Sequence, residues 1–76
     1  MQIAEAGALL SEMYRNALLG EKVLSIHVFG IRYANEIKSM RPEEIAILAE
    51  LPKSYGTEIR KGIKLAKYVR IKNPAG

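Results

Sequence analysis

Cysteine and tryptophan are absent from this chain of 76 residues, and histidine occurs once. Without cysteine there is no disulfide, no thiol nucleophile and no cysteine-ligated zinc or iron–sulfur site. The single His27 has no second histidine or carboxylate at ligand spacing, so we interpret it as a partly buried structural residue. There is no glycine-rich phosphate loop, and the adjacent Glu43 and Glu44 point to different sides of a helix. These absences predict a protein that is not an enzyme and that holds no cofactor, metal or small-molecule ligand.

Long hydrophobic runs are also missing. No stretch approaches the roughly 18 consecutive apolar residues of a membrane span, and the start, Met-Gln-Ile-Ala-Glu, lacks the positive leader of a secretion signal. We therefore expect a cytoplasmic protein that does not contact a membrane. Its composition, 49% hydrophobic and 26% charged, is typical of a globular domain. The short length predicts one domain over 1–72, with a disordered tail over 73–76.

Acidic charge is scarce in the last third of the chain, although the formal net charge of the whole is only +4. Residues 1–50 carry five basic and seven acidic side chains, a balance of −2, whereas residues 51–76 carry seven basic side chains and one acid, a balance of +6. Such asymmetry indicates that one end of the fold contacts a polyanion such as nucleic acid.

The first half of the chain has the periodicity of amphipathic helices. Apolar residues recur at helical spacing from Ile3 to Leu18, which predicts a helix ending near Gly20, where glycine can adopt the left-handed cap conformation. The next segment is ambiguous, because residues 23–28 alternate as a half-buried strand would while a longer helical pattern overlaps them. We favour a helix over 26–39, with a short extended piece before it as the alternative.

The second half predicts two short helices joined by a tight turn. Pro42 suits the first turn of a helix, where its missing N–H is not needed, and the following carboxylates suit the positive end of the helix dipole. Pro52 ends this helix, and Ser54 is available as the N-cap of the next one. Two helices in this arrangement are typical of a helix-turn-helix unit.

The last helix has one basic side and one apolar side. At about 100° per residue, the cations gather opposite the apolar residues as far as Val69. This is the arrangement that a helix needs if one side packs on a small core and the other meets phosphates and base edges in a DNA major groove. The candidate DNA-binding residues are Lys53, Ser54, Thr57, Arg60, Lys61, Lys64 and Lys67.

Residues 45–62 carry the pattern of a known motif: a small residue in the first helix, an aliphatic residue after the turn, a Ser-Tyr pair and an aliphatic residue followed by a charged pair and glycine. The residues at these places are Ala46, Leu51, Ser54, Tyr55, Ile59, Arg60, Lys61 and Gly62. The segment resembles the helix-turn-helix of phage-repressor-type DNA-binding domains. This resemblance implies a helix–helix contact at Ala46 and core anchors at Leu51 and Ile59. It also implies that five side chains face DNA, those of Lys53, Ser54, Thr57, Glu58 and Lys61.

The chain departs from that pattern in two places. Glu50 stands in the turn where glycine is usual, and Gly56 stands where the recognition helix usually has a branched aliphatic residue. Gly56 predicts either close helix packing or a loosened first turn. The resemblance also allows the last helix to stop at Gly62, in which case residues 67–72 form a strand that pairs with residues 23–28 in a winged variant.

Other interpretations of the same residues stay open. Leu51-Pro52 followed by Gly56 is similar to a helix-hairpin-helix, but the hairpin glycines that would expose backbone N–H groups to phosphate are missing. The basic side is alternatively a solvated surface. A protein-interaction adaptor is the competing function, and it would use the apolar residues Leu18, Leu19, Val23 and Leu24.

Taken together, the patterns predict an all-α compact bundle of about four short helices that contains a helix-turn-helix. The predicted function is a small regulator or accessory factor of bacterial or phage type that binds duplex DNA. A homodimer is expected, because one such module contacts few base pairs.

Overall fold

The structure is a computed structural model, and it describes residues 1–72. In chain order the elements are α1 (Ile3–Asn16), α2 (Lys22–Arg32), α3 (Ala34–Ile37), α4 (Pro42–Leu48), the 3₁₀ turn η1 (Lys53–Tyr55) and α5 (Gly56–Leu65). The all-α prediction is confirmed, with five α-helices in place of about four. No strand occurs within 1–72, so the winged alternative is wrong. The tail predicted at 73–76 lies outside the described residues.

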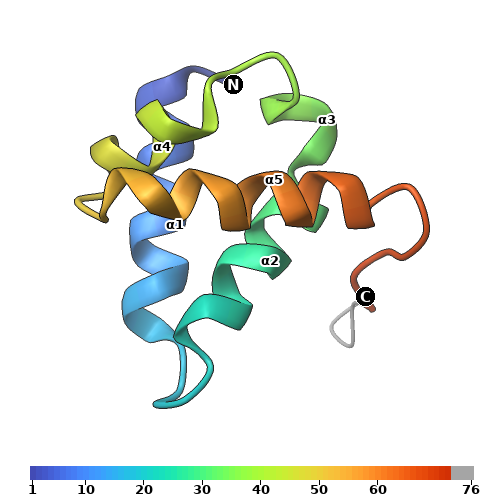
Figure 1. Ribbon diagram of the computed structural model, residues 1–76, viewed down its shortest axis with the longest axis horizontal. Coiled ribbons are helices and arrows are strands. Elements are labelled where there is room, and N and C mark those ends of the chain that lie inside the picture. The colour runs from blue at the N-terminus through green and yellow to red at the C-terminus, as the bar shows by residue number, and fades with distance from the viewer. Residues whose placement is uncertain (73–76) are drawn as a thin grey trace.

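The helices form a bundle in which α5 lies on one broad side. Helices α1 and α2 make a hairpin, α4 packs against α1, and α5 crosses in front of both α1 and α2 (Figure 1). The core is entirely apolar, with no buried polar or charged side chain among residues 1–72. Its members come from all five α-helices: Ala6, Leu10, Ile26, Phe29, Ile37, Ile45, Ala46, Ala49 and Ile59. The α5 helix is therefore held from one side only, which leaves its other side free.

Helix α1 ends at Asn16, four residues before the predicted end near Gly20. The ammonium group of Lys22 explains the earlier end, because it donates hydrogen bonds to the backbone carbonyls of Tyr14 and Arg15, at 2.9 and 3.0 Å. The last carbonyls of a helix lack the usual partner four residues on, although the Tyr14 carbonyl also accepts from the Ala17 N–H at 3.3 Å, and a cation suits the negative end of the helix dipole. Gly20 does take a left-handed conformation, with φ of +90°, but in the turn that leads into α2.

Helix α2 starts at Lys22, four residues earlier than predicted, and residues 23–28 are helical rather than extended. The strand-like alternation was misleading because Val23 and Leu24 are exposed, so this pattern does not mark a buried side. The predicted single helix over 26–39 is also interrupted at Tyr33, where φ is −109° and ψ is 19°. The Tyr33 ring packs against Phe29, with ring centroids 5.5 Å apart.

Two glycines bring α2 and α5 into direct backbone contact. A Cβ atom on Gly62 would lie 2.5 Å from the carbonyl oxygen of His27, and one on Gly30 would lie 2.7 Å from the carbonyl oxygen of Ile59. Real Cβ atoms do not approach backbone atoms so closely. The crossing therefore requires glycine on both helices, and it fixes the position of α5 along α2.

The turn after α4 is a Schellman motif. The N–H of Leu51 donates to the carbonyl of Ala46, and the N–H of Glu50 donates to the carbonyl of Ile47, both at 2.9 Å. Glu50 takes the left-handed conformation, with φ of +63°, which explains why glycine is usual at this place. The three predicted roles in this unit are confirmed: Ala46 and Ile59 are fully buried, and Leu51 packs against the core.

Helix α5 begins differently from the prediction. Ser54 is not an N-cap; it lies within η1, and no side chain caps either η1 or α5. Gly56 is the first residue of α5, and a Cβ there would lie 3.0 Å from the backbone nitrogen of Glu43. The close packing predicted from Gly56 is thus confirmed, against the start of α4. At its other end α5 stops at Leu65, beyond Gly62 but short of Val69.

Candidate nucleic-acid interface

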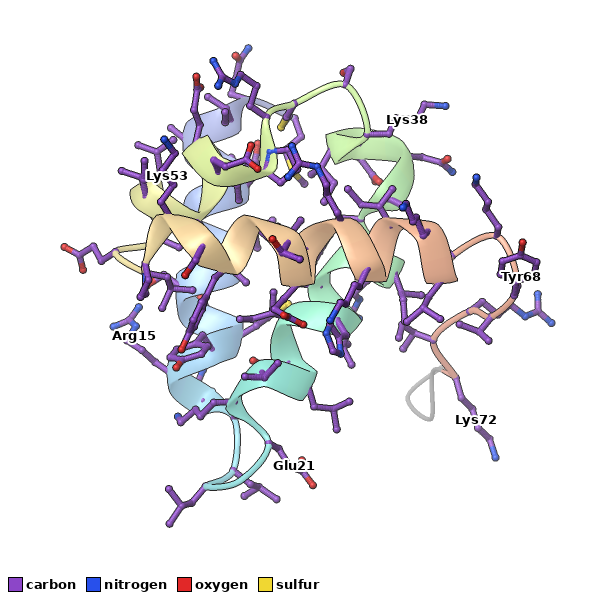
Figure 2. All side chains as sticks on the ribbon, viewed as in Figure 1. Arg15, Glu21, Lys38, Lys53, Tyr68 and Lys72 are labelled. Atoms are coloured by element: carbon purple, nitrogen blue, oxygen red, sulfur yellow. The ribbon has the colours of Figure 1, made fainter. Side chains whose placement is uncertain are left out.

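The outer side of α5 carries three of the predicted residues. Ile59 and Gly62 are buried against α2, and the opposite side of the helix presents Thr57, Lys61 and Lys64 to solvent. Figure 2 shows α5 lying across the front of the molecule, with its outer side toward the viewer. A straight helix that projects from a broad side is the shape that can lie in a major groove.

The remaining lysines extend this surface at both ends of α5. Lys53 and Ser54 are exposed on η1, directly before the helix, and Lys67 is exposed in the turn directly after it. Figure 2 shows Lys53 beside the start of α5 and Tyr68 beyond its end. Tyr68 is 84% exposed, so its ring does not pack on the core. The predicted DNA-binding residues therefore lie along one connected, solvent-facing path.

Arg60 lies at the edge of this path and is already engaged. Its guanidinium forms a two-point ion pair with the Glu43 carboxylate of α4, with Nη2 lying 3.1 Å from Oε1. The hydrogen bonds from Arg60, together with a backbone hydrogen bond, hold the pKa of the Glu43 carboxyl below its ordinary value. Arg60 thus joins α5 to α4. A ligand that contacts its guanidinium also meets the Glu43 carboxylate.

Glu58 lies at the other edge of α5 and turns toward α2. Its Oε1 atom lies 2.6 Å from His27 Nε2 and 3.6 Å from Lys61 Nζ. The hydrogen bond with His27, and then the Lys61 charge, lower the pKa of the Glu58 carboxyl. The side chains of His27 and Glu58 are each 24% exposed, so the prediction of a partly buried structural His27 is confirmed. Glu58, which the resemblance places toward DNA, lies at the edge of α5 beside α2 and is engaged with His27 there.

Two basic residues near α5 were missed by sequence reasoning. Lys38 and Arg41 lie in the connection between α3 and α4, and both line a cavity of about 340 Å³ together with Arg60 and Lys64. They belong to residues 1–50, whose charge balance is negative, so charge counting overlooked them. The only available signal was two cations three residues apart just before Pro42.

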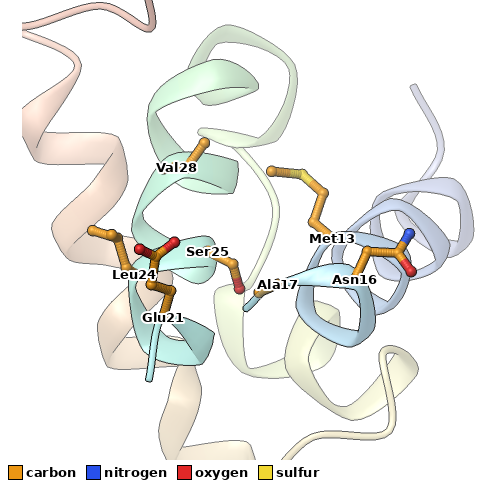
Figure 3. Close-up of a pocket in the computed structure, with 7 residues that line it drawn as sticks. All are labelled: Met13, Asn16, Ala17, Glu21, Leu24, Ser25 and Val28. Atoms are coloured by element: carbon orange, nitrogen blue, oxygen red, sulfur yellow. The ribbon is translucent and has the colours of Figure 1, made fainter. Parts of the chain in front are cut away.

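The residues of the alternative adaptor surface cluster at the turn between α1 and α2, which we call the apolar tip (residues 18–24). Leu19 is 97% exposed and Leu18 is 69% exposed, and Val23 and Leu24 are about half exposed. Beside the tip, α1 and α2 border a hollow of about 250 Å³ (Figure 3). Its lining consists of Met13, Asn16, Ala17, Glu21, Leu24, Ser25 and Val28. The tip is thus a second exposed surface, without the cations of α5.

The whole described chain matches one family. The family model of the HTH-like domain matches residues 2–72. The chain belongs to the HTH-like domain family. The match extends from α1 to the residues after α5, far beyond the motif at 45–62, and it supports a helix-turn-helix domain without specifying the phage-repressor type. No curated protein and no solved structure matches the chain.

Within 1–72, no three His, Asp or Glu side chains come together in a way that could hold a metal ion. None of the helices there has the length and apolar character needed to span a bilayer.

Proposed function

We propose that this HTH-like domain is a binding protein rather than an enzyme, and that it binds duplex DNA through the outer side of α5. The observation that carries the proposal is the position of α5 on a broad side of the molecule. Gly62 packs its inner side closely against α2, and the lysines on its outer side face solvent. Family membership supports the same role, because helix-turn-helix domains place such a helix in the major groove.

The residues divide into two roles. Lys53, Ser54, Thr57 and Lys61, around the first half of α5, lie close to base edges in this arrangement, whereas Lys64 and Lys67 contact phosphates. Arg60 reaches a phosphate only together with its Glu43 partner, so its contribution to affinity is small. The protein acts as a regulator or accessory factor of bacterial or phage type, and two copies bind two half-sites.

Salt dependence of DNA binding tests this proposal. Each phosphate contact adds about 0.9 to the slope of log affinity against log salt concentration. We expect Lys64→Gln to lower that slope by about 0.9, as measured by fluorescence anisotropy with a labelled duplex. Arg15→Gln is the matched control, because it also removes one positive charge but lies on α1 and donates to the Ser11 carbonyl. If the folded protein does not bind duplex DNA at low salt, the proposal is wrong.

A second candidate function comes from the apolar tip. Four large apolar side chains exposed on the α1–α2 turn and the start of α2 are unusual for a surface with no partner, and they favour an adaptor that joins another protein. Association through the tip would depend little on salt, since it buries apolar area. Chemical-shift mapping distinguishes the two functions: shifts at 53–67 on adding duplex DNA support DNA binding, and shifts at 18–31 on adding a protein partner support the adaptor.

A further inference from the structure

The two edges of α5 differ in charge. The edge beside α2 presents Glu58, paired with His27, and Leu65. The edge beside α4 and the connection before it, residues 38–41, adds cations from outside the helix-turn-helix. A helix in a major groove has a phosphate backbone at each of its edges, because the two backbones form the walls of the groove. The difference in charge between the edges therefore indicates which of the two phosphate backbones the protein binds.

Two neighbouring cavities lie along the basic edge, and we call them together the groove. One cavity of about 340 Å³ is lined by residues of the α3–α4 connection and of α5, and a second of about 270 Å³ continues it toward the end of α5. Lys38 and Ile63 line both cavities. Apolar residues such as Met40, Ile63 and Ala66 form part of its lining. The cations that line it are Lys38, Arg41, Arg60, Lys64 and Lys67.

Carboxylates neutralise only part of this groove. Arg60 is paired with Glu43, and Arg41 lies 3.8 Å from Glu44. No ion pair within 4.0 Å joins Lys38, Lys64 or Lys67 to a carboxylate among residues 1–72. Three lysines with free ammonium groups thus line the two walls, Lys38 on one side and the two lysines of the α5 side on the other.

We infer that this groove is an anchor for one phosphate backbone of duplex DNA, with Lys38 as a phosphate contact supplied from outside the helix-turn-helix. The inference rests on the proposed function, because the same α5 must lie in the major groove for the phosphates to reach Lys38. Lys64 lies on the outer side of α5 and also lines the groove, so it connects the side of α5 that faces the bases to the anchor. At the edge beside Glu58, the cation that the described residues place nearest is Lys61, which is already 3.6 Å from the Glu58 carboxylate.

The test compares Lys38→Gln with Arg15→Gln. Both variants remove one positive charge, but Figure 2 shows Lys38 and Arg15 at opposite sides of the molecule. Between 50 and 200 mM salt, one phosphate contact accounts for about a 3.5-fold loss of affinity. Over this range, the salt-induced decrease in affinity should therefore be about 3.5-fold smaller for Lys38→Gln than for the wild type. For Arg15→Gln it should equal that of the wild type. Anisotropy with a labelled duplex measures all three proteins.

A second readout follows the groove without a variant. Asn35 lines the groove, and its side-chain amide gives separate signals in an NMR spectrum. Those signals should shift when a short duplex is added to the wild-type protein.

The outcomes separate the inference from the proposed function. If the wild type binds DNA but Lys38→Gln keeps the wild-type salt slope, the groove is not an anchor and the proposed function stands. An equal decrease of the salt slope in Lys38→Gln and Arg15→Gln also overturns the anchor, because it shows an effect of net charge alone. If the folded wild type does not bind at low salt, both proposals are wrong.

Discussion

The inner and outer sides of α5 are stabilised in different ways. On the inner side, Gly62 lets the backbone of α5 touch the backbone of α2, and Ile59 is fully buried. On the outer side, Thr57, Lys61 and Lys64 face solvent. The inner side tolerates almost no change of volume, whereas the outer side is constrained only by helix propensity.

This difference separates stability from binding within one short helix. Substitutions on the inner side should change the free energy of unfolding, and substitutions on the outer side should change the affinity for DNA. The edges of the helix, at Glu58 and Arg60, belong to both categories because their ion pairs join α5 to its neighbours.

Gly62→Ala should be the most damaging small substitution in α5. Alanine is favoured over glycine in a helix by about 1 kcal/mol, but its Cβ would lie 2.5 Å from the His27 carbonyl oxygen, so α2 and α5 must move apart. Overpacking of this kind costs up to about 3 kcal/mol, so we expect a net loss of about 2 kcal/mol in the free energy of unfolding, measured by urea denaturation. Lys61→Ala, one residue away on the outer side, is the control and should change stability by less than about 0.5 kcal/mol. A Gly62→Ala protein as stable as the wild type would contradict the glycine crossing.

Glu50→Gly should increase stability. Glu50 is the left-handed residue of the Schellman turn before η1, and an L-residue other than glycine pays about 1 kcal/mol to adopt that conformation. We expect the variant to gain roughly 1 kcal/mol while the slope of DNA affinity against salt is unchanged. Glu12→Gly in the middle of α1 removes the same charge and should lose roughly 1 kcal/mol. Equal effects of the two glycines, in sign and size, would show that the turn carries no strain.

The sequence predicted much of the fold because its signals were local. Pro42 at a helix start and apolar spacing in α1 depend on near neighbours along the chain. The errors arose where tertiary contacts decide the outcome. Lys22 ends α1 by bonding its carbonyls across the turn. The α5 helix starts at Gly56 because of its contact with α4, and not because of a cap at Ser54.

The candidate site was predicted in composition but not in arrangement. A helical wheel places the lysines of α5 on one side, and the structure agrees. The wheel does not show which edge meets α2 or α4, so it could not reveal that Arg60 pairs with Glu43 or that Glu58 pairs with His27. Lys38 reaches the same surface only through the fold, since 25 residues of chain lie between it and Lys64.

The pair between Glu58 and His27 should make stability depend on pH at the edge of α5. The folded protein lowers the pKa of the Glu58 carboxyl, so the ionised carboxylate stabilises the fold. This contribution is fully present above the unfolded pKa of about 4.3 and is lost as the pH falls through the lower folded value. The difference in unfolding free energy between wild type and Glu58→Gln should therefore shrink between neutral pH and about pH 3.

Urea denaturation across that pH range measures the effect, and His27→Gln is the control. Because the hydrogen bond with His27 is the largest cause of the lowered pKa, Glu58→Gln should change stability less in the His27→Gln background than in the wild type. A difference between wild type and Glu58→Gln that stays constant with pH would contradict the pair.

The double variant Lys64→Ala, Lys67→Ala should have the smallest effect on stability and a clear effect on binding. Both side chains are exposed, Lys64 on α5, where alanine suits the helix, and Lys67 in the turn after it, so the free energy of unfolding should change by less than about 0.5 kcal/mol. If each lysine contacts a phosphate, the slope of log affinity against log salt concentration should fall by about 1.8. Anisotropy titrations at several salt concentrations measure that slope, with the double variant Arg15→Ala, Arg32→Ala as the control for loss of two charges. A destabilised double variant would show that the outer side also supports the fold, and an unchanged slope in a stable one would show that these two lysines only keep the surface solvated.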